Sequence, residues 1–199
     1  MDGNDYTWNR NCLVTERGIF QYSMVLGLDI GSLQGKDILD IGAGAGLFER
    51  ECSKLGINVI SLDPAYSLSA DPESNSPYGN LDIGKYLMVR RNRDNKITGV
   101  NEALPFRDGS FDVVLSTFSS YFYLIDNYLL ERQDDVFRLF TEEVVRVLRP
   151  GGEARIGQIV YHQDRMHVLD GMIEENQSFR YEMTPLTERA KDYMILYKH

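Results

Sequence analysis

A glycine-rich turn in the first quarter of the chain carries the residue types best suited to binding a ligand. Residues 36–48 read KDILDIGAGAGLF: an apolar run, glycine at positions 42, 44 and 46, and the start of a helical pattern. Glycine has no Cβ, so a ligand can approach the backbone closely, and it adopts positive φ at little cost. The unpaired amides of the first helical turn then point towards a ligand that is bound over the glycine turn. The pattern predicts a cradle for a nucleotide-type cofactor at the carboxyl end of a strand.

Two side chains of this turn indicate which kind of cofactor it suits. A dinucleotide fingerprint, G-x-G-x-x-G, requires glycine at position 47, where this chain has Leu47. Asp40 lies two positions before the first glycine, where a carboxylate repels a pyrophosphate and favours a cationic ligand. Both residues disfavour an NAD-binding oxidoreductase, which stays open as an alternative.

The next apolar segment ends in a second carboxylate. Residues 57–63 (INVISLD) are predicted to form a strand, and Asp63 follows Gly46 by seventeen positions. A carboxylate at the end of the second strand can accept two hydrogen bonds from a ribose diol. NAD enzymes share this feature, so Asp63 indicates an adenosine cofactor without choosing one. Alternatively, Asp63 caps the segment that begins at Pro64.

Three segments of the chain resemble the class I S-adenosylmethionine-dependent methyltransferases, in particular the methyltransferase type 11 group. Residues 40–46 (DIGAGAG) resemble motif I of that family. Residues 101–116 (NEALPFRDGSFDVVLS) resemble the loop and fourth strand, and residues 142–152 (EEVVRVLRPGG) resemble the helix and turn before the fifth strand. The likeness covers roughly residues 35–160. S-adenosylmethionine, the cofactor that the resemblance implies, carries an ammonium and a sulfonium, which accords with Asp40.

The resemblance implies an α/β fold, a three-layer Rossmann-like sandwich with a seven-stranded, mostly parallel sheet whose last strand is antiparallel. At 199 residues the chain is expected to be one domain, with an N-terminal helical cap (1–34) and a Rossmann-like core (35–199). The strands predicted at 179–183 and 193–198 are too close for a crossover helix, so they are expected to pair antiparallel.

Hydrophobic periodicity and turn residues place the other elements. Apolar residues at helical spacing predict a helix over 45–55 whose Leu47, Phe48, Cys52 and Leu55 face the sheet and which ends at Gly56. The remaining predicted elements are helices over 15–28, 134–148 and 164–175, and strands over 97–100, from 111 onwards, and over 153–160.

The resemblance implies a set of cofactor-binding residues: Asp40, Gly42, Ala43, Gly44, Gly46, Asp63, Pro64, Asn101, Glu102, Ala103, Ser116 and Thr117. Val100 stands where the family often has Asp, so the adenine contact falls to Asn101, Glu102 or the Ala103 amide, and all three remain open. The strand that ends at Ser116 and Thr117 leads to the transferable methyl group. In the helix before the first strand, Tyr22 or Arg17 could touch the cofactor carboxylate, with packing as the alternative for Tyr22.

Methyl transfer from a sulfonium is an in-line displacement of an activated donor, so the protein mainly aligns the reactants and excludes water. No metal is required, and the three histidines show no ligand spacing. The candidate catalytic residues are Tyr121, Tyr123 and His162. Aromatic side chains at 118 and 121–123 could stabilise the sulfonium by cation–π attraction, or could simply pack.

The charge of the chain and the residues after the fourth strand narrow the acceptor. A formal net charge of −9 disfavours binding to DNA. Residues 117–120 (TFSS) lack the Asn/Asp-Pro-Pro-Tyr/Phe of related amino-methylating enzymes and the cysteine nucleophile of cytosine carbon-5 enzymes. We therefore expect a small-molecule or short polar acceptor, bound by residues 1–25, 65–95 and 118–132. The basic residues Lys85, Arg90, Arg91, Arg93 and Lys96 are expected to form a solvated surface.

Two cysteines, Cys12 and Cys52, do not form a disulfide framework and are expected to be reduced thiols. The polar, acidic start of the chain has no apolar signal region, and no run is long enough to cross a bilayer. These features predict a cytoplasmic protein without membrane association. A non-catalytic S-adenosylmethionine-binding partner subunit is the alternative function, and the sequence leaves the oligomeric state and the acceptor atom open.

Overall fold

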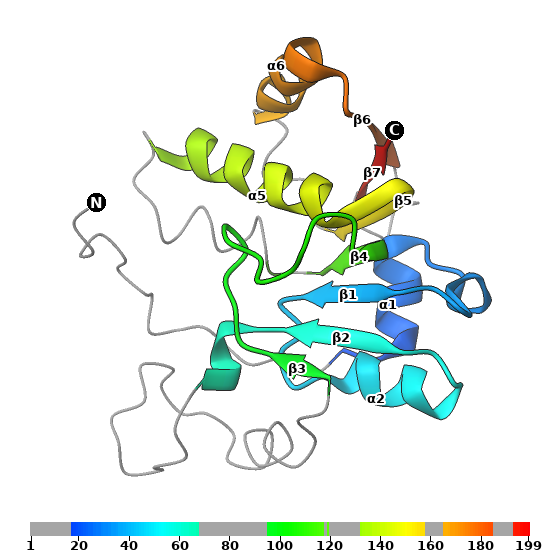
Figure 1. The fold of residues 1–199 in the computed structure, drawn as a ribbon. Coiled ribbons are helices and arrows are strands. Elements are labelled where there is room, and N and C mark those ends of the chain that lie inside the picture. Colours follow the sequence, from blue (N-terminus) through cyan, green and yellow to red (C-terminus); the bar gives the residue numbers. More distant parts are fainter. Residues whose placement is uncertain (1–16, 68–94, 118, 120–131, 158–164, 185–192) are drawn as a thin grey trace.

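A seven-stranded sheet forms the centre of the computed structural model, which describes residues 17–67, 95–117, 119, 132–157, 165–184 and 193–199 (Figure 1). The strand order is β3-β2-β1-β4-β5-β7-β6. The strands are β1 (Ile38–Ile41), β2 (Val59–Leu62), β3 (Lys96–Ile97), β4 (Phe111–Ser116), β5 (Leu148–Gly157), β6 (Phe179–Thr184) and β7 (Tyr193–Lys198).

Most of the sheet is parallel, and β7 runs against both of its neighbours. The pairs β1–β2, β1–β4, β2–β3 and β4–β5 are parallel, whereas β7 pairs antiparallel with β5 and with β6. The predicted fold class and the antiparallel pairing of the last two strands are therefore confirmed.

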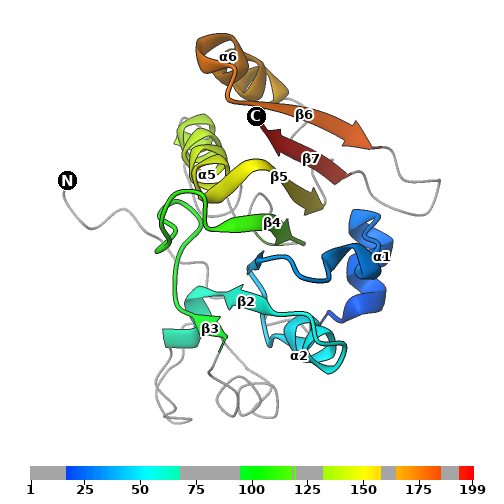
Figure 2. The same cartoon turned by 45° about the vertical axis from the view of Figure 1, so that its right-hand side comes forward.

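Helices cover both faces of the sheet (Figures 1 and 2). On one face α1 (Ile19–Leu26) and α2 (Leu47–Lys54) pack over side chains such as Ile38 and Val113. On the other face lie α5 (Gln133–Val147) and α6 (Met166–Asn176). Short 3-10 helices lie before β1, at Ile30–Leu33 (η1), and after β2, at Pro64–Ser67 (η2). Because both faces are covered, all four residues of β1 are buried, as in a central parallel strand.

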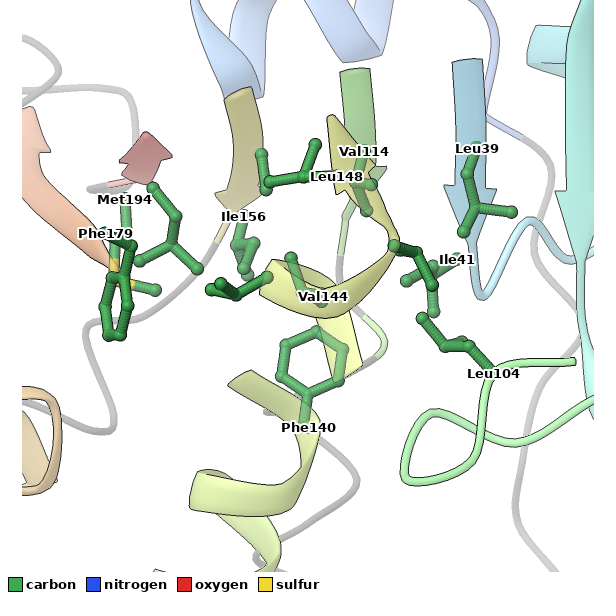
Figure 3. Close-up of a cluster of buried hydrophobic side chains, with 14 of the residues drawn as sticks. Leu39, Ile41, Leu104, Val114, Phe140, Val144, Leu148, Ile156, Phe179 and Met194 are labelled. Atoms are coloured by element: carbon green, nitrogen blue, oxygen red, sulfur yellow. The ribbon is translucent and has the colours of Figure 1, made fainter. Parts of the chain in front are cut away.

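The larger of the two cores joins α5 to the centre of the sheet, and Figure 3 shows part of it. Phe140 and Val144 of α5 face the sheet, and Leu104, from the loop before β4, lies beside Ile41 of β1. The loop that contains Leu104 is thus packed into the core that α5 covers.

Three predicted details differ from the structure. Leu55 was expected to face the sheet but is 52% exposed. Its amide donates to the Cys52 carbonyl at 2.9 Å, an i→i+3 bond that tightens the last turn and rotates Leu55 away. The third strand covers only Lys96–Ile97, because Val100 instead forms an isolated bridge with Ala103.

The fifth strand begins earlier than predicted, at Leu148 rather than at Glu153. Phe111 pairs with Leu148 and Val113 with Glu153, so the segment between these β5 positions forms an irregularity inside the strand. Gly151 supplies a φ of 79° there. The predicted strand end at 158–160 and the start of the first helix at 15–16 lie outside the described residues. The division into a cap (1–34) and a core (35–199) stays a prediction.

Candidate cofactor site

The loop after β1 is held open by glycines in the left-handed region. Gly42, Gly44 and Gly46 have φ values of 71°, 56° and 73°. The Gly42 amide donates to the Leu62 carbonyl of β2 at 2.8 Å, which fixes where the loop leaves the sheet. A Cβ on Gly42 would lie 2.1 Å from the Cβ and Oγ of Ser119. Only glycine fits at position 42, for reasons of both φ and space.

The segment after β4 is tied to the same loop by two serines. The Ser119 hydroxyl donates to the Ile41 carbonyl at 2.9 Å, and the Ser116 and Ser119 hydroxyl oxygens lie 2.9 Å apart. After β1 the chain continues to β2 on one side of the sheet, and after β4 it continues to β5 on the other side. The carboxyl ends of the parallel neighbours β1 and β4 therefore form the switch point at which open α/β sheets bind ligands. Ser119 lies in the 118–132 segment expected to bind the acceptor but was not among the predicted cofactor residues, and no signal beyond its position after β4 marks it.

The Asp63 carboxylate at the end of β2 holds the glycine loop from the other side. Its Oδ2 accepts a hydrogen bond from the Gly44 amide at 3.0 Å. The Tyr66 amide of η2 donates to the Asp63 backbone carbonyl at 3.2 Å, which places Asp63 at the N-cap position of η2, so the capping alternative stays open. Asp63 therefore lies beside the turn that follows β1.

Asp40 is fully buried, and its partner is a phenol of α1. The Tyr22 hydroxyl lies 2.7 Å from Oδ1 and 2.8 Å from Oδ2 of Asp40, and the Tyr22 ring stacks on Phe48 with centroids 4.0 Å apart. Tyr22 thus contacts both oxygens of a carboxyl group that has no exposed surface. The sequence had left Tyr22 open between ligand contact and packing, and the structure gives it a polar contact within a packed helix.

Burial is the main cause of the pKa shifts of Asp40 and Tyr22. Desolvation raises the pKa of Asp40 to about 8; the Tyr22 hydrogen bond and the charge of Arg17 oppose this rise, and the charge of Asp63 adds to it. Burial also raises the pKa of Tyr22, with the charge of Asp40 adding and Thr117 opposing. A carboxyl group with a pKa near neutrality can be ionised by a nearby cation at little cost, so the site favours a positively charged ligand.

The segment after β3 lies next to Asp63. The Asp63 amide donates to the Ile97 carbonyl at 3.1 Å, and from there the chain enters a tight turn closed by the Val100–Ala103 bridge. The Ala103 amide contacts the Val100 carbonyl at a long 3.4 Å. The side chains of Asn101 and Glu102 are half-buried. All three candidates for an adenine contact therefore occupy one turn.

The structure gathers the predicted cofactor residues along one edge of the sheet, at or after the carboxyl ends of β1 to β4, namely Asp40, Gly42, Ala43, Gly44, Gly46, Asp63, Pro64, Asn101, Glu102, Ala103, Ser116 and Thr117. The candidate catalytic residues Tyr121, Tyr123 and His162 lie outside the described residues, as do Phe118, Phe122, Cys12 and most of the expected acceptor region. Cys52 is buried as a free thiol.

Lys96 departs from the expected solvated surface, while the other four basic residues of that cluster are outside the described ranges. Its ammonium lies 5.7 Å from the centroid of the Tyr66 ring, and its side chain reaches the glycine loop, where a Cβ on Gly46 would be 2.9 Å from Lys96 Cε. Burial lowers the pKa of Lys96, and the charge of Glu49 opposes this. Lys96 thus packs under the loop.

Within the described ranges, no helix has the length and apolar character that a bilayer crossing requires. Over the same residues, no group of three or more His, Cys, Asp or Glu side chains is arranged to hold a metal ion.

A mostly parallel sheet, a glycine turn at its switch point and carboxylates at the ends of β1 and β2 define a nucleoside-cofactor-binding α/β domain. Residues 39–156 match the family model described as a methyltransferase domain. The chain belongs to this methyltransferase family, whose cofactor is S-adenosylmethionine. The buried carboxylate and the Cβ-free turn fit a cofactor with a cationic amino-acid end and a bulky nucleoside.

Curated relatives and solved structures agree with this family. The chain is 30% identical over 130 residues to a demethylmenaquinone methyltransferase of Renibacterium salmoninarum, covering 65% of this chain and 44% of the relative. It is 32% identical over 124 residues to "Probable phthiotriol/phenolphthiotriol dimycocerosates methyltransferase 2" of Mycobacterium ulcerans, covering 60% and 38%. The chain thus matches less than half the length of these relatives. The fold is similar to that of a SAM-dependent methyltransferase from Methanosarcina mazei (TM-score 0.51, 15% identity, 92% and 99% coverage).

Proposed function

We propose that this protein transfers a methyl group from S-adenosylmethionine to a small-molecule or short polar acceptor. The observation that carries the proposal is the meeting of Asp40, the glycine turn and Asp63 at the switch point of the sheet. S-adenosylmethionine supplies the activated methyl group, so the chain has to bind, align and exclude water.

The strand order supports one orientation of the cofactor. The switch point between β1 and β4 is next to Asp40 and Ser116, whereas β2 and β3 lie successively further out. A ligand with its cationic end at Asp40 therefore extends its ribose towards Asp63 and its base towards the 100–103 turn. Asp40 is buried beside the Tyr22 phenol, so an ionised Asp40 attracts the cation through its charge.

The proposed acceptor class rests on charge and on the relatives. A net charge of −9 opposes a polyanionic acceptor such as DNA. The two relatives described above are named for methylation of a menaquinone precursor and of a phthiotriol lipid, which are small molecules. Neither substrate is assigned to this chain.

Asp63→Ala is expected to weaken binding of S-adenosylhomocysteine about tenfold, because a carboxylate that accepts from the ribose and from the Gly44 amide is lost. Asp63→Asn is the matched control, since it keeps one oxygen for the Gly44 amide. We expect it to retain more of the thermal stability of the ligand-free protein than the alanine variant does. Calorimetry and thermal unfolding measure both effects. Unchanged affinity in both variants would remove Asp63 from the site.

A screen of acceptors tests the proposed activity. The protein is incubated with S-adenosylmethionine and with phenols, hydroxyquinones, small amines, carboxylic acids or duplex DNA, and release of S-adenosylhomocysteine is measured. We expect turnover with one of the small-molecule classes and none with DNA. Turnover with DNA alone would contradict the acceptor class. Tight binding of S-adenosylmethionine without turnover in any class would instead support a non-catalytic subunit.

A further inference from the structure

One arginine of α5 uses its whole guanidinium to hold the loop before β4. The five N–H groups of Arg146 all have acceptors. Nε and Nη2 donate to the two Glu143 oxygens at 2.7 Å each, and Nη2 also donates to the Leu104 carbonyl at 2.9 Å. Nη1 donates to the Phe106 carbonyl at 2.7 Å and to Asp108 at 2.8 Å. A guanidinium has five donors in a fixed plane, so this set is complete.

Glu143 extends the same clamp to the preceding peptide. Its Oε2 accepts from the Leu104 amide at 2.6 Å while also accepting from Arg146. Hydrogen bonds from Arg146 hold the pKa of Glu143 below its usual range against the opposing effect of burial, so the pair stays charged. The planes of the Ala103–Leu104 and Leu104–Pro105 peptides are therefore both fixed by α5.

The clamped peptides adjoin the turn that faces the candidate cofactor site. The amide that Glu143 binds belongs to the same planar peptide as the Ala103 carbonyl, so its orientation determines the direction in which the 101–103 turn projects. The helix itself is a rigid base, because Val144 and Val147 are fully buried in the core.

We propose that the Arg146–Glu143 pair is a positioning unit. It fixes the orientation of the backbone of the 100–103 turn, which meets the cofactor base, and so determines the preference of the site for adenine over other bases. This inference rests on the proposed function, in which the 100–103 turn meets the base. Arg146 does not touch the ligand and acts through the backbone of residues 103–106. An adenine edge presents a 6-amino donor and an N1 acceptor, whereas hypoxanthine presents a 6-oxo acceptor and an N1–H donor. Backbone N–H and C=O groups that are held in fixed directions pair well with only one of these two patterns, so they distinguish adenine from hypoxanthine.

An arginine elsewhere on α5 provides a matched control. Arg138 pairs with the side chains of Glu142 and Glu175 on the exposed side of the helix, and neither of these partners belongs to the 100–108 loop. Arg138→Lys therefore makes the same chemical change on the same helix without altering the clamp.

The test compares two ligands in calorimetry: S-adenosylhomocysteine and S-inosylhomocysteine, which carries hypoxanthine. The wild-type protein is expected to prefer the adenine ligand about tenfold or more. In Arg146→Lys a compact ammonium keeps the charge but has three donors in place of five, so it cannot satisfy both carbonyls and both carboxylates together. The preference should then fall to within about threefold. Arg138→Lys should keep the wild-type ratio.

Glu143→Gln is the second variant, since it keeps the size of the side chain and one acceptor oxygen, and it should lose discrimination in the same way. Equal weakening of both ligands in these two variants, with the ratio unchanged, would overturn the inference and leave the clamp a structural feature only. A wild-type protein that binds neither ligand would instead contradict the proposed function, so the two failures are distinguishable.

Discussion

Asp40→Asn is expected to weaken binding of S-adenosylhomocysteine about tenfold or more at pH 8.5 and to change it little at pH 6. Burial raises the pKa of Asp40 to about 8, so the wild-type carboxyl is mostly neutral at pH 6 and resembles the amide of the variant. Above that pKa the buried carboxylate attracts the ligand ammonium through its charge, which the neutral amide cannot do. Calorimetric titrations of both proteins at the two pH values measure the difference.

The same substitution should stabilise the ligand-free protein at high pH. An aspartate with a folded-state pKa of about 8, against an ordinary value of 3.8, contributes stability that is present below pH 4 and lost as pH rises through 8. The loss is on the order of 5 kcal/mol. We therefore expect the free energy of unfolding of Asp40→Asn, relative to wild type, to increase from pH 5 to 8 and then level off.

Asp37→Asn is the matched control for both measurements. Asp37 precedes the other end of β1, is exposed and pairs with Arg149 at 2.6 Å. Removing this charge should leave ligand affinity and its pH dependence as in wild type, because surface ion pairs contribute little. Equal pH profiles of wild type and Asp40→Asn would contradict a role for the Asp40 charge in ligand binding.

Gly42→Ala is expected to destabilise the protein by about 3 kcal/mol or more and to abolish cofactor binding. The new Cβ would lie 2.1 Å from both Cβ and Oγ of Ser119, so rotation of the serine side chain does not relieve the overlap. The loops after β1 and β4 would have to separate, which breaks the Ser119 hydrogen bond to the Ile41 carbonyl. Thermal unfolding and calorimetry measure the two effects.

Gly35→Ala separates backbone strain from steric overlap. Gly35 has a φ of 72°, nearly the same as that of Gly42, but a Cβ there would meet nothing within 4 Å. The control should therefore cost only the left-handed strain of about 1–2 kcal/mol and keep cofactor binding. Similar stability losses in the two variants would mean that the contact with Ser119 does not constrain the loop.

The sheet could be predicted from the sequence because its strands show local hydrophobic periodicity. The glycine turn could be predicted because few other structures require three closely spaced glycines. Apolar β1 before three alternating glycines defines a strand, a turn and a helix within one short window. The predicted cofactor residues fall on one edge because parallel strands place their carboxyl ends together.

The contacts that hold the site together come from residues distant in sequence, and the sequence did not reveal them. Tyr22 reaches Asp40 from a helix eighteen positions earlier, and Arg146 reaches Leu104 across forty-two. Such pairs depend on how α1 and α5 lie on the sheet rather than on any local spacing. The Leu55 and β5 errors arise similarly, from a tightened helix turn and from a strand irregularity that periodicity does not encode.

The central claim is that the turn after β1 receives a cationic sulfur nucleoside. A 1H–15N correlation titration of the protein with S-adenosylmethionine tests it most directly. We predict saturable shifts of the Gly42, Gly44 and Gly46 amides, while Gly35 and Gly56, outside this edge of the sheet, stay in place. Amides of the turn that respond to NAD but not to S-adenosylmethionine, or shifts confined to another part of the chain, would contradict this assignment.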